Sequence, residues 1–319
     1  MRKVLLATTA IVALGGVSAA SADISISGGH ELKYQSWNNS TSTSANNSKI
    51  SSGATYTISG STVLDNGMTI SGKLYSDNVA DGTAAMESNG FSISDDWGTI
   101  GVADMESGDA FATAIDITDD EGYDGGAVSG INTYAPGDEY VAGSDVSYLS
   151  PNISGFQFSV GINDTGAYSD ATSVGAMYAM SAGDAAVTVK YAASNTGDTS
   201  SGAADEIDAT SAALVIGMSG ATVTLAQNTA DVGTTAEYES SGMAFAYVVS
   251  DSLTVEAYSG ETENNLDSDY KFKDTGYGIT YTVTPGMTLS VTHNSWDYVS
   301  NAAASDDGTN TAVAVNVSF

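Results

Sequence analysis

The sequence predicts an all-β chain in which sixteen antiparallel strands close into a barrel. The first observation is a two-residue period: apolar residues alternate with small or polar ones along most of the chain, and no helical pattern of useful length interrupts them. The second is that seven tight turns alternate with eight long loops, and these fifteen connections join sixteen strands. An even number of strands can close a sheet without a free edge.

The first 22 residues are predicted to be a secretory signal peptide. Arg2 and Lys3 precede the apolar stretch 4–17, and Ala20-Ser21-Ala22 has the small-x-small form of a signal peptidase site. The apolar stretch is short for a membrane-spanning helix, although an N-terminal anchor is the alternative. We therefore expect export through the Sec pathway and a single barrel domain at residues 23–319.

The strands that follow have one apolar and one polar face. In residues 156–162, Phe156, Phe158 and Val160 share one face, while the other face carries residues such as Gln157. Such alternation indicates strands whose two faces meet different surroundings. Other clear runs are 54–59, 68–74, 173–180, 185–191, 243–249, 277–283, 287–293 and 311–319.

The connections carry turn and loop chemistry rich in Gly, Asn, Asp and Ser. Pro151 and Pro285 lie in tight turns and Pro136 in a long loop, so proline interrupts no predicted strand. The predicted tight turns are 64–67, 95–98, 151–155, 181–184, 219–220, 250–252 and 284–286. The predicted long loops are 36–48, 77–89, 105–142, 164–171, 194–208, 229–235, 260–273 and 296–309.

The composition excludes several classes of function. The chain has no Cys, so it has no disulfides, no thiolate zinc site and no thiol nucleophile. After the first 22 residues it keeps all 39 acidic residues but only six basic ones, all Lys. Nucleic acid is an improbable partner for such a surface, because binding it requires cationic contacts to phosphate. A surface with this net negative charge is instead expected to attract cations.

The run 311–319 raises the question of which face is buried. Val313, Val315, Val317 and Phe319 share one face and would be buried in a soluble sandwich but exposed to lipid in a membrane barrel. The alternation of short turns and long loops, the small polar opposite faces and the aromatic residues near strand ends all favour the membrane. These aromatic residues are Tyr34, Trp37, Tyr75, Trp97, Tyr148, Tyr191, Tyr258, Trp296 and Tyr298.

With these features the chain resembles the Gram-negative general porins, and most of all those of alphaproteobacteria. The most specific part is "GFSISDDWGTIGVADMESGDAF" (90–111), in which a strand, a tight turn, a second strand and a long third loop follow in the family's order. The resemblance implies a homotrimer in outer-membrane lipid and lipopolysaccharide, a pore for small hydrophilic solutes, and a third outer loop folded into the lumen. It also implies that Phe319 is the C-terminal assembly signal.

In the family the third loop narrows the pore, and here the matching loop, 105–142, is rich in acid. Some of its carboxylates would face the lumen and favour cations over anions; the alternative is an ordinary solvated acidic loop. The candidates are Glu106, Asp109, Asp116, Asp119, Asp120, Glu121 and Asp124, with Asp138 and Glu139 further along. A weakly held Ca²⁺ on residues 119–124 is conceivable, but no calcium-binding motif supports it, and no other cofactor or metal is expected.

The opposite wall requires inward cations, and strand parity supplies four candidates. Lys33, Lys49, Lys73 and Lys190 are out of phase with the apolar residues of their runs, so we expect them to face the lumen. The first three would form a small cluster facing the acidic loop, and the alternative is a solubilising rim. Family members commonly carry Arg here, and the chain beyond residue 22 has none. Lys271 and Lys273 are expected in a loop.

An enzyme is not expected, because no nucleophile elbow or zinc-protease motif is present and both His30 and His293 fall in the apolar phase of their strands. The function predicted is passive diffusion of small hydrophilic solutes and ions, with a preference for cations. The alternative is a secreted or surface-attached acidic β-rich adhesin without a pore, although we find no short repeat that would support one.

Overall fold

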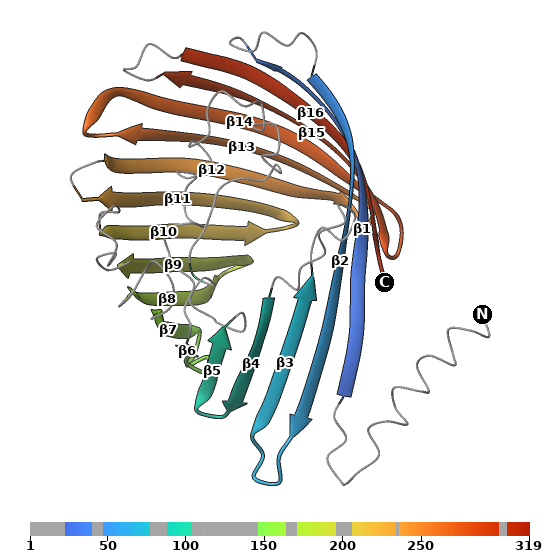
Figure 1. Ribbon diagram of the computed structural model, residues 1–319, viewed down its shortest axis with the longest axis vertical. Coiled ribbons are helices and arrows are strands. Elements are labelled where there is room, and N and C mark those ends of the chain that lie inside the picture. Colours follow the sequence, from blue (N-terminus) through green and yellow to red (C-terminus); the bar gives the residue numbers. More distant parts are fainter. Residues whose placement is uncertain are drawn as a thin grey trace.

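The computed structural model describes residues 23–39, 47–76, 88–103, 111, 146–163, 171–195, 206–233, 236–299 and 305–319. These residues form sixteen antiparallel strands in one closed barrel, each paired with its neighbour in sequence (Figure 1). The predicted sixteen-stranded antiparallel barrel is therefore confirmed, whereas the third outer loop expected in the lumen lies, apart from Phe111, outside the described residues. Among the residues described, no helix is long and apolar enough to cross a membrane. The strands are β1 (Asp23–Asn39), β2 (Asn47–Val63), β3 (Thr69–Ser76), β4 (Ser88–Asp95), β5 (Gly98–Ala103), β6 (Val146–Leu149), β7 (Phe156–Asn163), β8 (Ala171–Ala182), β9 (Ala185–Asn195), β10 (Ile207–Met218), β11 (Ala221–Val232), β12 (Ala236–Ser250), β13 (Leu253–Asn264), β14 (Asp267–Thr284), β15 (Met287–Val299) and β16 (Ser305–Ser318).

The barrel closes where β16 pairs with β1. The register runs from Gly29 opposite Ser318 to Asn39 opposite Gly308, and main-chain hydrogen bonds between Gly28 and Phe319 extend it by one step. In Figure 1 the two strands lie side by side. The predicted closing strand is thus correct, and closure leaves neither strand with an unpaired edge along this register.

The large apolar side chains lie on the outside of the barrel. Ile26 and Leu32 of β1 and Tyr277 of β14 are 53 %, 55 % and 62 % exposed, and similar residues follow around the sheet at every second position. A soluble protein rarely exposes so large a continuous apolar surface. The pattern is that of a barrel whose outer face contacts hydrocarbon.

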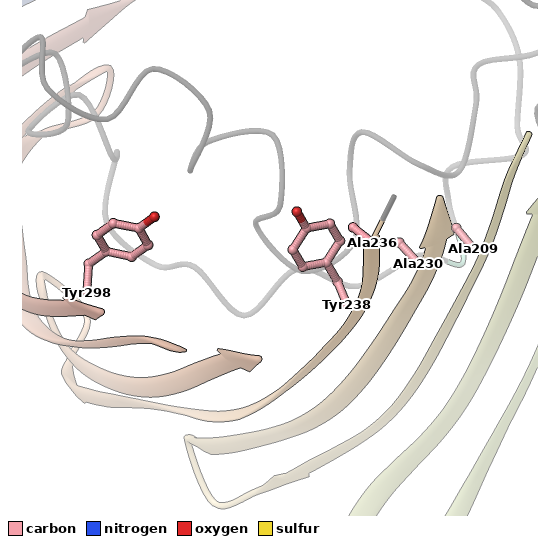
Figure 2. Packing of buried hydrophobic residues seen from close by; sticks show 5 residues of the cluster. All are labelled: Ala209, Ala230, Ala236, Tyr238 and Tyr298. Atoms are coloured by element: carbon pink, nitrogen blue, oxygen red, sulfur yellow. The ribbon is translucent and has the colours of Figure 1, made fainter. Parts of the chain in front are cut away.

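The inner wall is small and polar, with local apolar patches. Buried inward residues include Ser211, Asn228 and Asn294. Figure 2 shows a patch in which Tyr238 and Tyr298 project from the same face of the sheet as three alanines. These alanines are Ala209, Ala230 and Ala236. An aqueous interior lined in this way agrees with the polar face expected from the sequence.

Two of the connections that were predicted to be long loops are short in the structure. A long loop was expected at 260–273, but β13 and β14 continue as a paired hairpin and only Asn265 and Leu266 connect them. The connection expected at 229–235 is also shorter, since β11 ends at Val232 and β12 begins at Ala236. Residues 1–22, the predicted signal peptide, lie outside the described residues.

Five of the aromatic residues assigned to the membrane interfaces face inward instead. Trp37 lies opposite Asn310 in the phase of Lys33, and Tyr75 lies opposite Thr57 in the phase of Lys73. Tyr258, Trp296 and Tyr298 are buried and share the phase of Asn294 and the other inner-wall residues of their strands. Trp97 and Tyr148 do lie outside, where their rings stack with centroids 6.3 Å apart and the Tyr148 hydroxyl donates to the main-chain oxygen of Trp97.

Candidate functional site

The strand register fixes where each of the four lysines points. Residues opposite one another in an antiparallel ladder project from the same face. Lys33 lies opposite Ala314 and Ser51, and Lys190 lies opposite Ala213. Lys49 lies opposite Gln35, and Lys73 opposite Ser59. All four positions are out of phase with the exposed apolar residues of their strands and therefore face the interior.

Lys33 is the most enclosed of the four. Its side chain is only 3 % exposed, and its Nζ lies 3.3 Å from a carboxylate oxygen of Glu31, two positions back on the same face of β1. Next to it, Gln35 is also buried, and Lys49 lies opposite Gln35. Lys33 and Lys49 are thus diagonal neighbours, roughly 7–8 Å apart at their Cα atoms.

The register does not bring Lys73 to this pair. Its partner Ser59 is eight residues along β2 from Ser51, the partner of Lys33. At about 3.3 Å per residue the two levels are about 26 Å apart along the strand. The expected cluster of three lysines is therefore reduced to Lys33 and Lys49.

Phe111 is the described residue of the connection between β5 and β6, and it lies on the inner wall. Its ring is 2 % exposed and packs with Ala192 of β9, with Leu149 and Met177 beside it. In the order of strands, β8 is seven places from β1. Phe111 thus lies on nearly the opposite side of the sixteen-stranded barrel from Lys33.

Lys190 lies on the same wall as Phe111. Its partner on β8 is Met177, and Ala192, two positions further along β9, contacts Phe111. Lys190 is consequently on the same side of the lumen as Phe111, whereas Lys33 and Lys49 are across the lumen from it.

The acidic candidates of the third loop lie outside the described residues, as do the carboxylates considered for Ca²⁺. These are Glu106, Asp109, Asp116, Asp119, Asp120, Glu121 and Asp124. The described inner wall carries acids that the sequence analysis missed, namely Glu256 and Asp274 in addition to Glu31. Strand parity could have found them, because Glu256 is out of phase with Val255 and Ala257. Within the described parts, no group of three or more metal-binding side chains is gathered.

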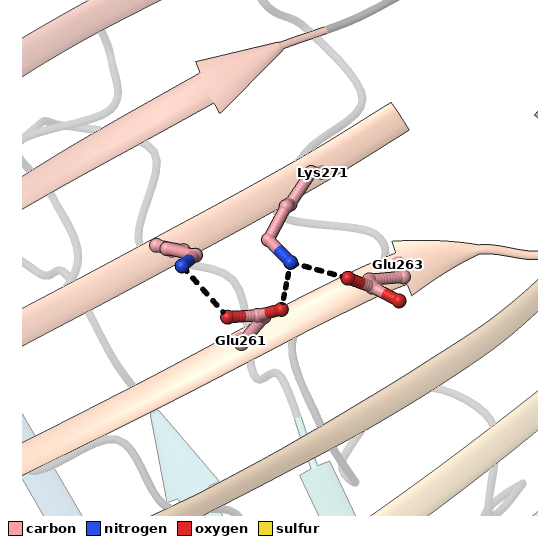
Figure 3. A network of polar contacts seen from close by, with 4 residues as sticks. Glu261, Glu263 and Lys271 are labelled. Carbon is pink, nitrogen blue, oxygen red and sulfur yellow. Dashed lines mark hydrogen bonds and ion pairs between the residues drawn. The ribbon is translucent and has the colours of Figure 1, made fainter. Parts of the chain in front are cut away.

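Lys271 and Lys273 are strand residues, contrary to expectation. They lie opposite Glu263 and Glu261 in the ladder between β13 and β14, in phase with Tyr277 and hence on the outer face. Lys271 forms ion pairs with both glutamates, and Lys273 Nζ lies 3.1 Å from Glu261 (Figure 3). This network does not face the lumen.

Comparison with known proteins identifies the family. A sequence model of the Gram-negative porins matches residues 7–319. The chain belongs to the Gram-negative porin family. This porin is therefore an outer-membrane channel and not an enzyme, which rules out the adhesin hypothesis. The search of curated proteins found no match.

Solved structures show that this porin shares its fold with distant relatives. In vitro folded OmpT of Vibrio cholerae matches with a TM-score of 0.64 at 12% identity, over 95% of this chain and 99% of that one. OmpT in its trimer form gives 0.63 at 11%, over 93% and 99%. A variant of the Rh. blastica porin gives 0.61 at 18% identity, over 93% and 100%.

Proposed function

We propose that this porin is a cation-preferring passive diffusion channel for small hydrophilic solutes, narrowed by its third loop. The observation that carries this proposal is the position of Phe111 on the inner wall, because that residue belongs to the connection between β5 and β6. Asp109 is only two residues away, so its Cα is within about 7 Å of that of Phe111. The carboxylates nearest Phe111 in sequence are therefore the best candidates for the acidic side of the constriction.

The positions of the charged side chains on the inner wall support an electric field directed across the lumen. Lys33 and Lys49 lie on β1 and β2, and Phe111 contacts the wall of the opposite strands. On the described inner wall these lysines, with Lys73 and Lys190, are offset by acids such as Glu31, Glu256 and Asp274. The preference for cations is thus expected to come mainly from the acidic third loop.

The test is the reversal potential of the purified protein in a planar bilayer under a KCl gradient. We expect a cation-selective potential that moves toward zero in the double variant Glu106→Lys, Asp109→Lys. The matched control is Asp231→Lys, an exposed residue in the outward phase of β11, which should leave the potential unchanged. Equal potentials in the wild type and the double variant would contradict the proposed role of these two carboxylates.

We further propose that the porin is exported by the predicted signal peptide and assembles as a homotrimer in outer-membrane lipid and lipopolysaccharide. The trimer form of OmpT supports the proposed homotrimer. The exposed apolar outer face supports its placement in lipid. Mass determination of the detergent-extracted protein tests it: a mass of three chains is expected, and a monomer from gentle extraction would refute it.

A further inference from the structure

The inner wall contains a socket that is shaped for the ring of Phe111. Gly175 of β8 forms its floor, and Ala192 of β9 and Ser159 of β7 lie opposite Gly175 in the two ladders. Ala192 has no exposed surface and Ser159 has almost none. A phenylalanine ring therefore covers three small residues that would otherwise line an aqueous lumen.

Glycine is required at the floor of this socket. A Cβ at position 175 would lie 3.1 Å from Phe111 Cβ, 2.8 Å from Ser159 Oγ and closer still to the ring carbon Cδ2. The backbone of β8 is an ordinary strand here, so the glycine serves close approach rather than an unusual backbone angle. Since apolar surface is driven out of water, the ring is held in the socket by burial.

We propose that Phe111 is an anchor that holds the third loop against the inner wall of β7–β9 and thereby sets the width of the channel. This inference rests on the proposed constricting loop and deepens it by naming a positioning residue. Phe111 itself carries no charge, so it acts on conductance through the chain it holds. The anchor joins residues 64 positions apart in sequence and packs the loop against the wall without a hydrogen bond from the ring.

The chain has no cysteine, so a disulfide can test the contact directly. The separation of 3.1 Å between Phe111 Cβ and a Cβ at position 175 is a few tenths of an ångström below the usual range of about 3.5–4.5 Å in disulfides. We expect the variant Phe111→Cys, Gly175→Cys to cross-link under mild oxidation, which blocks thiol labelling. Phe111→Cys, Ala192→Cys is a second pair if the first does not assemble.

The matched control is Phe111→Cys, Gly217→Cys. Gly217 also faces inward and has room for a side chain, with the nearest atom 4.0 Å from its Cβ position. It is six residues along β10 from Ser211, the partner of Ala192, or about 20 Å. This pair should stay reduced. Equal cross-linking of both pairs, or none in a folded barrel, would overturn the proposal.

Single-channel conductance then tests whether the contact sets the width. In the reduced variant Phe111→Cys, Gly175→Cys the anchor is lost, and we expect a larger and noisier conductance than in the wild type. Oxidation should restore the wild-type value, and a reductant should abolish the restoration in the same channel. A disulfide that forms without altering conductance would refute the anchor. Cross-linking and conductance do not depend on cation selectivity. The anchor can therefore be refuted independently of the proposed role of the acidic residues.

Discussion

Phe319 and Gly28 exchange two main-chain hydrogen bonds, of 3.0 and 3.1 Å, across the seam at which the barrel closes. The ring of Phe319 lies over Gly28, and a Cβ there would be 3.0 Å from its terminal carbon. Tyr56 and His30 surround the same ring, with centroids 6.2 Å away. The last side chain of the sequence thus packs on the first strand of the barrel.

Gly28→Val should weaken this seam. The added Cβ would lie 2.6 Å from the main-chain oxygen of Thr55, as well as against Phe319. Overpacking of this kind costs about 1–3 kcal/mol. Gly60→Val is the control, because this glycine faces outward on β2 and its Cβ position is 4.0 Å from the nearest atom. Urea unfolding of the protein in lipid vesicles measures both, and equal stabilities would contradict the prediction.

Lys33→Met should increase the preference for cations. It removes an inward positive charge, and unit charges 4 Å apart in water interact by about 1 kcal/mol, so the permeability ratio should rise by up to about fivefold. Lys271→Met removes a positive charge from the outer face and should change selectivity little. Reversal potentials under a KCl gradient distinguish the two. A larger change in the Lys271 variant would place the selective charges outside the lumen.

Tyr258→Phe should destabilise the inner wall. The Tyr258 hydroxyl donates to a carboxylate oxygen of buried Asp274 while its ring covers Gly276. Phenylalanine keeps the ring but loses the bond to a charged acceptor, at a cost of about 1.5–3 kcal/mol. Tyr277→Phe, on the exposed outer face, should stay within about 0.5 kcal/mol. Vesicle unfolding gives the comparison, and equal losses would argue against the hydrogen bond.

Two buried serines should respond differently to alanine. Ser240 shares a 2.8 Å hydrogen bond with Thr262, so Ser240→Ala should cost about 0.5–1.5 kcal/mol. The Oγ of Ser159 has no hydrogen-bond partner among the described residues. Ser159→Ala should therefore be neutral or stabilising, because it removes a buried polar atom that is not satisfied. A loss of stability in the Ser159 variant equal to that of Ser240 would refute this difference.

The alternation of side chains made the barrel predictable, since lipid and water impose opposite demands on the two faces of every strand. The same rule placed Val313 and Val317 outside and Lys33 inside. It failed at Glu261 and Lys271, because strands that extend beyond the apolar band meet water on their outer face. The strand ends then have the polar composition of a loop, although β13 and β14 remain paired there.

Register and long-range contacts could not be predicted. Parity gives the face of Lys73 but not its level on the wall, which depends on how β2 and β3 are offset. The contact of Phe111 with Ala192 joins distant residues, and nothing in either local pattern signals it. The inward position of Tyr258, in contrast, was available from its phase with Glu256 and was missed because only its place near a strand end was considered.

The closed seam has a consequence for how the chain reaches its final state. The hairpin of β13 and β14 has a two-residue connection, so its pairing fixes few residues and can form early. Pairing Gly29 with Ser318 instead brings together nearly the whole length of the chain. Loop-closure entropy makes such pairing slow and late. Until that last step both terminal strands keep unpaired edges, and at that stage the porin is most prone to aggregate and most in need of a chaperone.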